Sequence, residues 1–513
     1  MSQAAAPTNF RYRVLTVFLS LAFLNYLDRI CMARADKDVK RELQLRRITE
    51  ADKPREAELV QRFTATHEGR APTEAELEQI RTNLGEQLAR ERWSSIISAF
   101  QLGYVLFEIP GGWMGDYWGV RMVIVRIVVW WSVFTALTGS SDMLVHMMTS
   151  DPSPMTLVLV LWIVRFLFGV GEAGAYPNIS RAMSRWFPAE SRARVQGSLW
   201  LASRWGGAVS PLVYTYLLLG ATQFGGSWRW VFWFLGGIGI VWALLFGWWY
   251  RNTPEEMPGV NQAECDLIRT GAREGSIYDD HAHARVPWRR LFTSTNLIAL
   301  YIAAFCSSFA WYFHSSQLRN YMEEVFGVGK DPQDARPDWA LVAPLLGGGV
   351  CCILGGVLSQ WLVKKTGSLR WGRAVPGLIA FTSASICLLL VPWFNDHKQF
   401  MGAIVCITLC FTLQDLHMAV LWSLTSDIGG RLAGTLAGTL NMLGNVGGYM
   451  GILIVPWIIK QNTSYEHPTN WNNVFWMNGC VYLAGALMWL RVNANEKLLH
   501  AEDIVGRDTE IPT

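Results

Sequence analysis

The chain has 513 residues and a formal net charge of +3, with 51% hydrophobic, 13% aromatic and only 17% charged residues. Soluble globular proteins carry about 25% charged residues, so this composition excludes an ordinary soluble protein, a disordered chain and a secreted disulfide scaffold. The small net charge offers no argument for nucleic-acid binding. The 26 tryptophans suit membrane–water interfaces, while a mean hydropathy of only +0.19 indicates that polar segments interrupt an apolar majority.

Twelve apolar stretches are long enough to cross a bilayer, whose core of about 30 Å requires about 20 helical residues. They are residues 13–33, 94–114, 121–141, 155–178, 192–219, 228–250, 294–322, 339–363, 371–393, 399–425, 431–459 and 471–492. Lys and Arg cluster in the fourth and eighth connections, near Arg181 and Lys364, and are absent from residues 142–154 and 220–227. The positive-inside rule therefore places both termini in the cytoplasm.

Two polar segments interrupt the spans. Residues 34–93 form an outside loop, in which Thr73 and Glu76 make a capping box that predicts a helix from 74 to about 90. We interpret this loop as a solvated helical hairpin that caps the outer face, with partner binding as the alternative. Residues 251–293 form an inside linker, which divides the chain into domains 1–250 and 294–513. Two histidines in this linker, His281 and His283, are too few to predict a metal site.

The two halves of the chain repeat each other. Residues 111–114 recur at 355–358, residues 231–233 at 474–476, and Gly197 at Gly438, with offsets between 241 and 244. The repeat predicts two pseudo-symmetric six-helix bundles, an organisation typical of secondary transporters. Two glycine patches should provide smooth helix contacts between the moving bundles: Gly197, Gly206 and Gly207 in the fifth span, and Gly438, Gly447 and Gly448 in the eleventh.

Ionisable and polar side chains also occur inside the spans, where each charge costs roughly 3 kcal/mol or more. They are Asp28, Arg29, Glu108, Arg165, Glu172, Arg204, His314, Gln317 and Asp415. One interpretation is that they form permanent ion pairs that staple helices together. The other is functional: a buried carboxylate takes up a proton, and an arginine released from its carboxylate binds an anionic substrate.

Several stretches resemble a known family. They are Gly112-x-x-Gly-Asp116-x-x-Gly119-x-Arg121, Asn25-Tyr26-Leu27-Asp28-Arg29, residues 103–112, residues 165–178 and residues 427–431. The first resembles the loop signature of the major facilitator superfamily. Together they are similar to its anion:cation symporter family, which includes bacterial hexuronate, galactonate and glucarate transporters and animal sialin. The resemblance covers nearly the whole chain and implies the major facilitator fold.

The resemblance also implies residue roles. Asp28 and Glu172 match proton-coupling carboxylates, and Arg29 and Arg165 match paired arginines. Tyr26, Tyr104, Arg204 and Asn445 match substrate-binding positions, and polar His314, Gln317 and Asn441 are further candidates. Asp116 and Arg121 would form a gate, with Glu108 and Asp415 as possible additional site residues. The chain departs from the family at Tyr117, at residues 317–322 and in the long 34–93 loop.

We therefore expect a monomeric proton-coupled symporter in a bacterial inner membrane, importing a sugar acid (a hexuronate, aldonate or aldarate) by alternating access. No enzymatic motif, metal or cofactor is predicted, and the proton gradient supplies the driving force. Two alternatives remain. An organophosphate/phosphate exchanger requires facing arginines from both halves, but the second half offers only Arg319. A non-transporting membrane sensor would use the 34–93 loop as its ligand-binding head.

Overall fold

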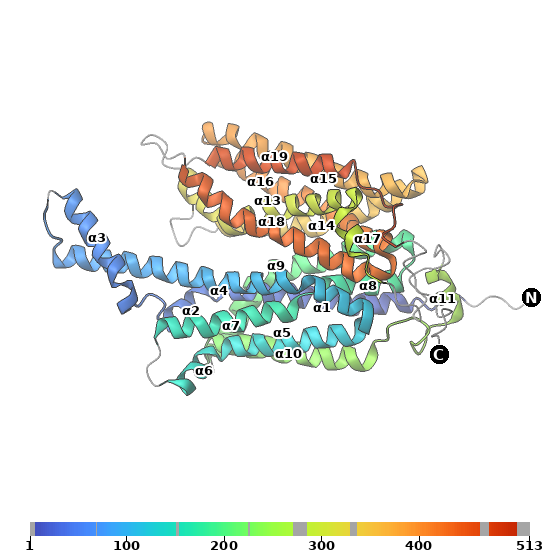
Figure 1. Ribbon diagram of the computed structural model, residues 1–513, viewed down its shortest axis with the longest axis horizontal. Helices are drawn as coiled ribbons and strands as arrows, with labels where there is room; N and C mark the ends of the chain where they lie inside the picture. The colour runs from blue at the N-terminus through green and yellow to red at the C-terminus, as the bar shows by residue number, and fades with distance from the viewer. Residues whose placement is uncertain are drawn as a thin grey trace, which may run out of the picture.

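The computed structural model describes residues 6–67, 69–149, 153–223, 226–269, 285–328, 336–461 and 471–499, and within these ranges it contains helices and no strands. The helices form two bundles that lie side by side along the long axis of the molecule (Figure 1). Across the described residues the twelve predicted spans and the two six-helix bundles are confirmed. His281 and His283 lie outside the described residues.

The N-terminal bundle consists of α1 (Phe10–Arg34), α4 (Glu74–Trp118), α5 (Val120–Gly139), α7 (Pro154–Glu172) with α8 (Ala175–Trp186), α9 (Arg192–Gln223) and α10 (Trp228–Trp249). The C-terminal bundle consists of α13 (Thr295–Phe326), α14 (Arg336–Thr366), α15 (Leu369–Asp396), α16 (Phe400–Gln414) with α17 (Leu416–Gly429), α18 (Ala433–Gln461) and α19 (Trp471–Trp489). Short helices complete the described chain: α2 (Asp36–Glu42), η1 (Glu50–Asp52), α3 (Lys53–Thr66), α6 (Ser141–Met148), η2 (Ala189–Ser191), α11 (Gln262–Arg269), α12 (Trp288–Thr293) and η3 (Gly430–Leu432).

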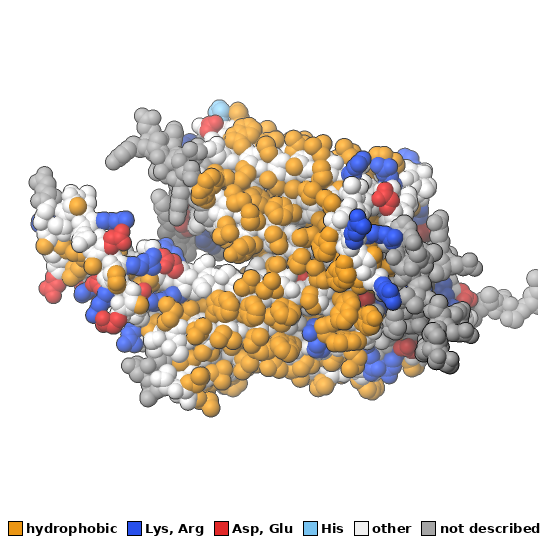
Figure 2. Space-filling view, viewed as in Figure 1, with side chains coloured by type: hydrophobic (Ala, Val, Ile, Leu, Met, Phe, Trp, Pro, Cys, Tyr) orange, Lys and Arg blue, Asp and Glu red, His pale blue; other side chains and the backbone are white. Residues whose placement is uncertain are grey.

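The visible surface of the bundles matches a membrane environment. Hydrophobic side chains cover the middle of this face, while Lys, Arg, Asp and Glu gather toward the two ends (Figure 2). Many large apolar side chains are exposed, among them Met122, Trp248 and Leu244, at 67%, 76% and 65%. In water such exposure would be unfavourable, so this surface belongs in a lipid bilayer.

The segment between the first two spans differs from its prediction. The helix expected to stop near residue 90 continues without a break into the second span as α4, because no glycine or proline lies between residues 86 and 102. With α3 it forms a hairpin that projects beyond the bundle instead of capping it (Figure 1). The base of this hairpin is held by Arg92, which donates to the carbonyls of Leu45 and Arg47 and pairs with Asp52 at 2.7 Å.

Two spans are interrupted at corresponding points of the halves. The fourth span breaks after Glu172, where Gly174 adopts a left-handed conformation (φ 84°) before α8 begins. The tenth span breaks at Asp415, between α16 and α17. The two acidic residues are 243 positions apart, the same offset as the sequence repeat. Each half therefore places a carboxylate where a membrane helix is interrupted.

Glycines bring the two bundles into backbone contact. A Cβ atom added at Gly112 of α4 would collide with the carbonyl oxygen of Gly434 in the first turn of α18, and one at Gly356 of α14 would collide with that of Ala193 on α9. Gly197 and Gly438 lie at the same two interfaces. The prediction that both glycine patches lie between the bundles is wrong in part. Gly206 packs on α1 and Gly447 on α13, each inside its own bundle.

The linker contacts the start of the chain. Glu264 of α11 is fully buried and accepts hydrogen bonds from the backbone N–H groups of Phe10 and Arg11, at 2.9 and 3.0 Å. These are unpaired donors of the first turn of α1, so the carboxylate caps that helix. Both described ends of the chain thus lie at one end of the molecule, opposite the hairpin (Figure 1); we refer to it as the terminal end.

The glycine contacts generate a prediction. Gly112→Val should push α4 from α18 and lengthen the distance between spin labels at Trp118 and Lys364, both exposed near the terminal end, because backbone atoms cannot move aside as a side chain can. Gly237→Val, which meets nothing within 4 Å, is the control and should leave the distance unchanged. An unaltered distance in Gly112→Val would show that this contact does not hold the bundles together.

Candidate functional site between the bundles

The centre of the site is an ion pair between α1 and α7. Arg29 donates to Oε1 of Glu172 from Nε at 3.2 Å and from Nη2 at 2.7 Å, and Asn25 donates to the same oxygen at 2.6 Å. Glu172 is 1% exposed, whereas the Arg29 side chain is 23% exposed. The second oxygen, Oε2, is buried and has no hydrogen-bond partner among the described residues. The acid is therefore sequestered, while its arginine remains accessible to an anion.

Aromatic rings surround Arg29. Its guanidinium carbon lies 4.7 Å from the ring centroid of Tyr104, 5.2 Å from that of Phe100 and 5.4 Å from that of Tyr26. Cation–π contacts of this kind are worth more where water is excluded. They fix the plane of the guanidinium and leave it able to fork onto an acidic group.

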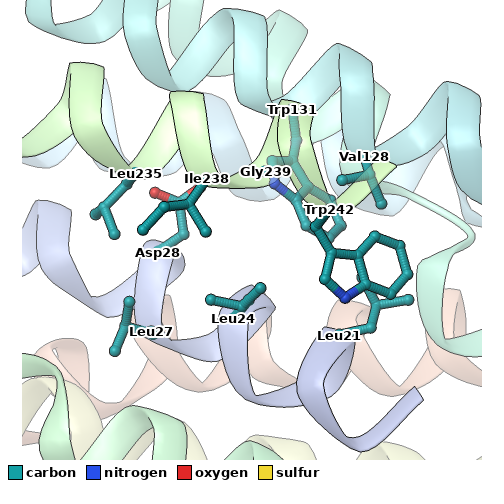
Figure 3. A pocket seen from close by; sticks show the side chains of 10 residues that line it. All are labelled: Leu21, Leu24, Leu27, Asp28, Val128, Trp131, Leu235, Ile238, Gly239 and Trp242. Carbon is teal, nitrogen blue, oxygen red and sulfur yellow. The ribbon is translucent and has the colours of Figure 1, made fainter. Parts of the chain in front are cut away.

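Arg165 and Asp28 lie behind this pair. Arg165 of α7 packs against Phe168, 4.3 Å from its ring centroid, and its buried Nε has no hydrogen-bond partner in the described structure. Asp28 accepts a hydrogen bond from Thr135 of α5 at 2.7 Å and is not part of the Arg29–Glu172 ion pair. It lines a small lateral pocket between α1, α5 and α10 (Figure 3). The structure therefore separates Asp28 from the Arg29–Glu172 pair.

Polar side chains of the other bundle approach from α18. Asn441 donates to Oε1 of Glu108 at 2.7 Å and to the Tyr104 hydroxyl at 3.1 Å. Asn445 accepts a hydrogen bond from Gln101 of α4 at 2.9 Å. Both asparagines are half-buried, so they combine accessibility with hydrogen-bonding capacity suited to hydroxyl groups.

A second ion pair connects the bundles. Arg204 of α9 donates to both oxygens of Asp415, from Nε at 2.7 Å and from Nη2 at 2.8 Å. His314 of α13 lies beside it, stacked on Phe411 with ring centroids 4.8 Å apart. Gln317 lies one turn further along α13 and accepts a hydrogen bond from Asn320 of the same helix. Among the described residues, Gln317 makes no hydrogen bond or ion pair with another predicted site residue.

The predicted gate pair is separated. Asp116, at the end of α4, pairs with Arg181 of α8 and accepts hydrogen bonds from the Gly434 and Thr435 backbone N–H groups at 3.0 and 2.6 Å. It therefore clamps the two bundles at the terminal end. Arg121 instead donates to the carbonyl of Gly247 on α10, inside the N-terminal bundle. The two predicted gating residues thus have different partners on either side of Gly119, whose φ is 82°.

Some site residues were missed by sequence reasoning. Gln101 binds Asn445, Arg181 and Thr435 hold Asp116, and Asp427 pairs with Arg373 at 2.9 Å and with Arg192 at 3.5 Å. In the sequence, Arg181 indicates only the orientation of the chain in the membrane, and the residues next to Gln101 give no sign that it belongs to the site. No group of three or more His, Cys, Asp or Glu residues in the described ranges could hold a metal ion.

The Major Facilitator Superfamily model matches residues 80–452. A probable sulfoacetate transporter of Cupriavidus necator is 31% identical over 414 residues, 81% of this chain and 87% of that protein. A probable galactarate/D-glucarate transporter of Escherichia coli is 26% identical over 381 residues, 72% of this chain and 79% of that protein.

Solved structures share the fold. A structure of the proton:xylose symporter XylE has a TM-score of 0.62 at 16% identity and covers 95% of this chain and 98% of that one. The human organic anion transporter MFSD10 also has a TM-score of 0.62, at 14% identity, and covers 93% of this chain and 99% of that one.

The clamp around Asp116 generates a prediction. Asp116→Asn should lower the free energy of unfolding by about 1.5–3 kcal/mol, the usual contribution of hydrogen bonds to a charged group, and should separate the bundles at the terminal end. Arg121→Gln is the matched comparison and should lower stability without separating them. Denaturant titration and the Trp118–Lys364 label distance measure the two effects. An equal distance change in both variants would contradict the assignment of the clamp to Asp116.

Proposed function

Because this chain belongs to the major facilitator superfamily, we propose that it is a proton-coupled symporter that imports a small organic anion of the sugar-acid type by alternating access. Membership makes the chain a membrane transporter and not an enzyme. The names of the relatives, which refer to sulfoacetate and to galactarate/D-glucarate, support an organic acid as the substrate. The proposal includes the bacterial inner membrane, cytoplasmic termini and a monomeric state.

The main observation behind the proposal is the ion pair between Arg29 and Glu172. Arg29 is accessible but is occupied by a carboxylate whose second oxygen has no partner in the described structure. When a proton reaches Glu172, the pair loses its charge attraction and Arg29 becomes free to bind an acidic group. The proton and the anion therefore enter together, since neither change is favourable alone in a water-poor site.

Reorientation follows from the contacts between the bundles. The terminal end is closed by the Gly112–Gly434 contact and by the Asp116 clamp. The ribbons of α4 and α18 diverge toward the hairpin end (Figure 1). With the termini in the cytoplasm, the end closed by these contacts is the inner one, so the proposal assigns this conformation to the loading step of an importer.

The exchanger alternative depends on arginines from both bundles that face each other, since a dianionic phosphate favours paired basic partners. Arg319, the candidate in the second half, lies exposed near the C-terminal end of α13. No observation favours this alternative over proton symport.

Proton coupling at Glu172 has a direct test. Proteoliposomes containing the wild type should accumulate galactonate, galactarate or sulfoacetate when an inward proton gradient is imposed. Glu172→Gln should reduce gradient-driven accumulation at least about tenfold, equivalent to about 1.4 kcal/mol, because the variant side chain cannot bind and release the proton. Substrate-for-substrate exchange should persist.

Glu58→Gln, on the exposed face of α3, is the control and should behave as the wild type. Accumulation that ignores the proton gradient, or that is unchanged in Glu172→Gln, would disprove the proton mechanism.

A variant of the hairpin formed by α3 and α4 can distinguish a transporter from a sensor. Arg55→Ala with Arg81→Ala removes the pairs with Glu91 and Glu56 that join α3 to α4. Exposed pairs contribute about 0–1 kcal/mol each, so we expect uptake within about twofold of the wild type. Loss of all uptake in this variant, with the protein still folded, would favour a head-like role of the hairpin.

A further inference from the structure

The Arg204–Asp415 ion pair has features that a structural staple does not require. It is bidentate and buried, with side chains 4% and 0% exposed, and it joins the N-terminal bundle to the C-terminal bundle. Asp415 lies at the break of the tenth span. Its counterpart in the sequence repeat is Glu172, which lies at the break of the fourth span. Each carboxylate at a helix break therefore neutralises one arginine of the site.

An aromatic path connects the two ion pairs. The Tyr26 ring lies under the Arg29 guanidinium and makes an edge contact with Trp200, with centroids 6.1 Å apart. The Arg204 guanidinium lies 5.6 Å from the Trp200 centroid and 4.2 Å from that of Trp311. Arg29 and Arg204 thus lie at opposite ends of the contact between Tyr26 and Trp200. Arg204 binds Asp415 through Nε and Nη2.

His314 supplies an independent observation at the Arg204 end. Its ring is 3% exposed, makes an edge contact with Trp311 at 5.2 Å, and has no hydrogen-bond partner for either nitrogen among the described residues. Burying an unpartnered polar group costs about 1–3 kcal/mol. An imidazole N–H that lies unpaired beside an arginine is suited to donate a hydrogen bond to the acidic group of a ligand.

We propose that Arg204 and His314 form a second anion subsite, closed in this structure by Asp415, and that the preferred substrate therefore carries two acidic groups. One acidic group binds Arg29 and the other displaces Asp415 from Arg204. This inference rests on the proposed function and names its substrate class: a short organic dianion, dicarboxylate or sulfocarboxylate.

The exchange at Arg204 is balanced. The entering carboxylate or sulfonate takes the bidentate position on Nε and Nη2 and accepts from the His314 imidazole N–H. Asp415, deprived of its arginine in a dry site, takes a proton from the water on the open side. The direct Arg204–Asp415 link between the bundles is thereby replaced by a link through the substrate, which joins Arg204 of the N-terminal bundle to His314 of the C-terminal bundle.

Matched ligand pairs test the inference. Galactarate and galactonate have the same carbon chain and differ in one terminal carboxylate, and sulfoacetate and acetate differ in the sulfonate. Titration calorimetry on the purified full-length protein should show the wild type binding each dianion at least about tenfold more tightly than its monoanion, equivalent to about 1.4 kcal/mol. Arg204→Gln and His314→Phe should abolish that preference, so that each variant binds the two members of a ligand pair with affinities within about twofold of one another. The phenylalanine keeps the ring contacts and removes the donor.

Asp415→Asn separates this subsite from a structural ion pair. If Asp415 competes with the substrate, the variant should bind the dianions at least as tightly as the wild type. If the pair is only structural, Arg204→Gln and Asp415→Asn should weaken both members of each ligand pair alike. The double variant Arg204→Gln/Asp415→Asn, which leaves no unpaired buried charge, secures the comparison should a single variant fail to fold.

The outcomes distinguish the inference from the proposed function. Equal affinity of the wild type for galactarate and galactonate, together with proton-driven galactonate uptake, would overturn the second subsite and leave symport intact. Absence of binding for every ligand of both pairs would overturn the proposed function and the subsite with it.

Discussion

A charge inside a membrane needs a partner, and in the described part of this protein the three arginines of the site are held by a carboxylate or by aromatic rings. Arg29 lies on Glu172 and Arg204 on Asp415, while Arg165 packs on Phe168. The cost of an unpaired charge in such a place is several kcal/mol. This constraint makes the pairs exchangeable only against another anion.

The same constraint explains why the two ion pairs have different surroundings. Arg29 is partly exposed and its carboxylate belongs to its own bundle. Arg204 is buried and its carboxylate belongs to the other bundle. The first pair can therefore change partner without disturbing the interface, whereas the second cannot. Glycine contacts and the Asp116 clamp close one end of this interface, and backbone surfaces without side chains allow it to close tightly and to part without unpacking a hydrophobic core.

Much of the fold was predictable because membrane helices are encoded by local composition. Span positions followed from apolar length, and the bundle symmetry followed from repeated glycine and aromatic anchors. Two predictions were wrong because they considered too few neighbouring residues. The helix after Thr73 meets no glycine or proline between residues 86 and 102 and so continues as one element. Gly206 and Gly447 are small residues like Gly197, but they face their own bundles.

The sequence by itself determined the membrane class, the two-bundle plan and the identities of the buried charges, since each of these is a property of residue type and spacing along one helix. Only the tertiary structure decided the partners. It assigned Glu172 to Arg29, Asp415 to Arg204, Asp28 to Thr135 and Asp116 to Arg181 and Thr435. Which carboxylate meets which arginine depends on how helices rotate and cross, and that is set by packing between segments far apart in the chain.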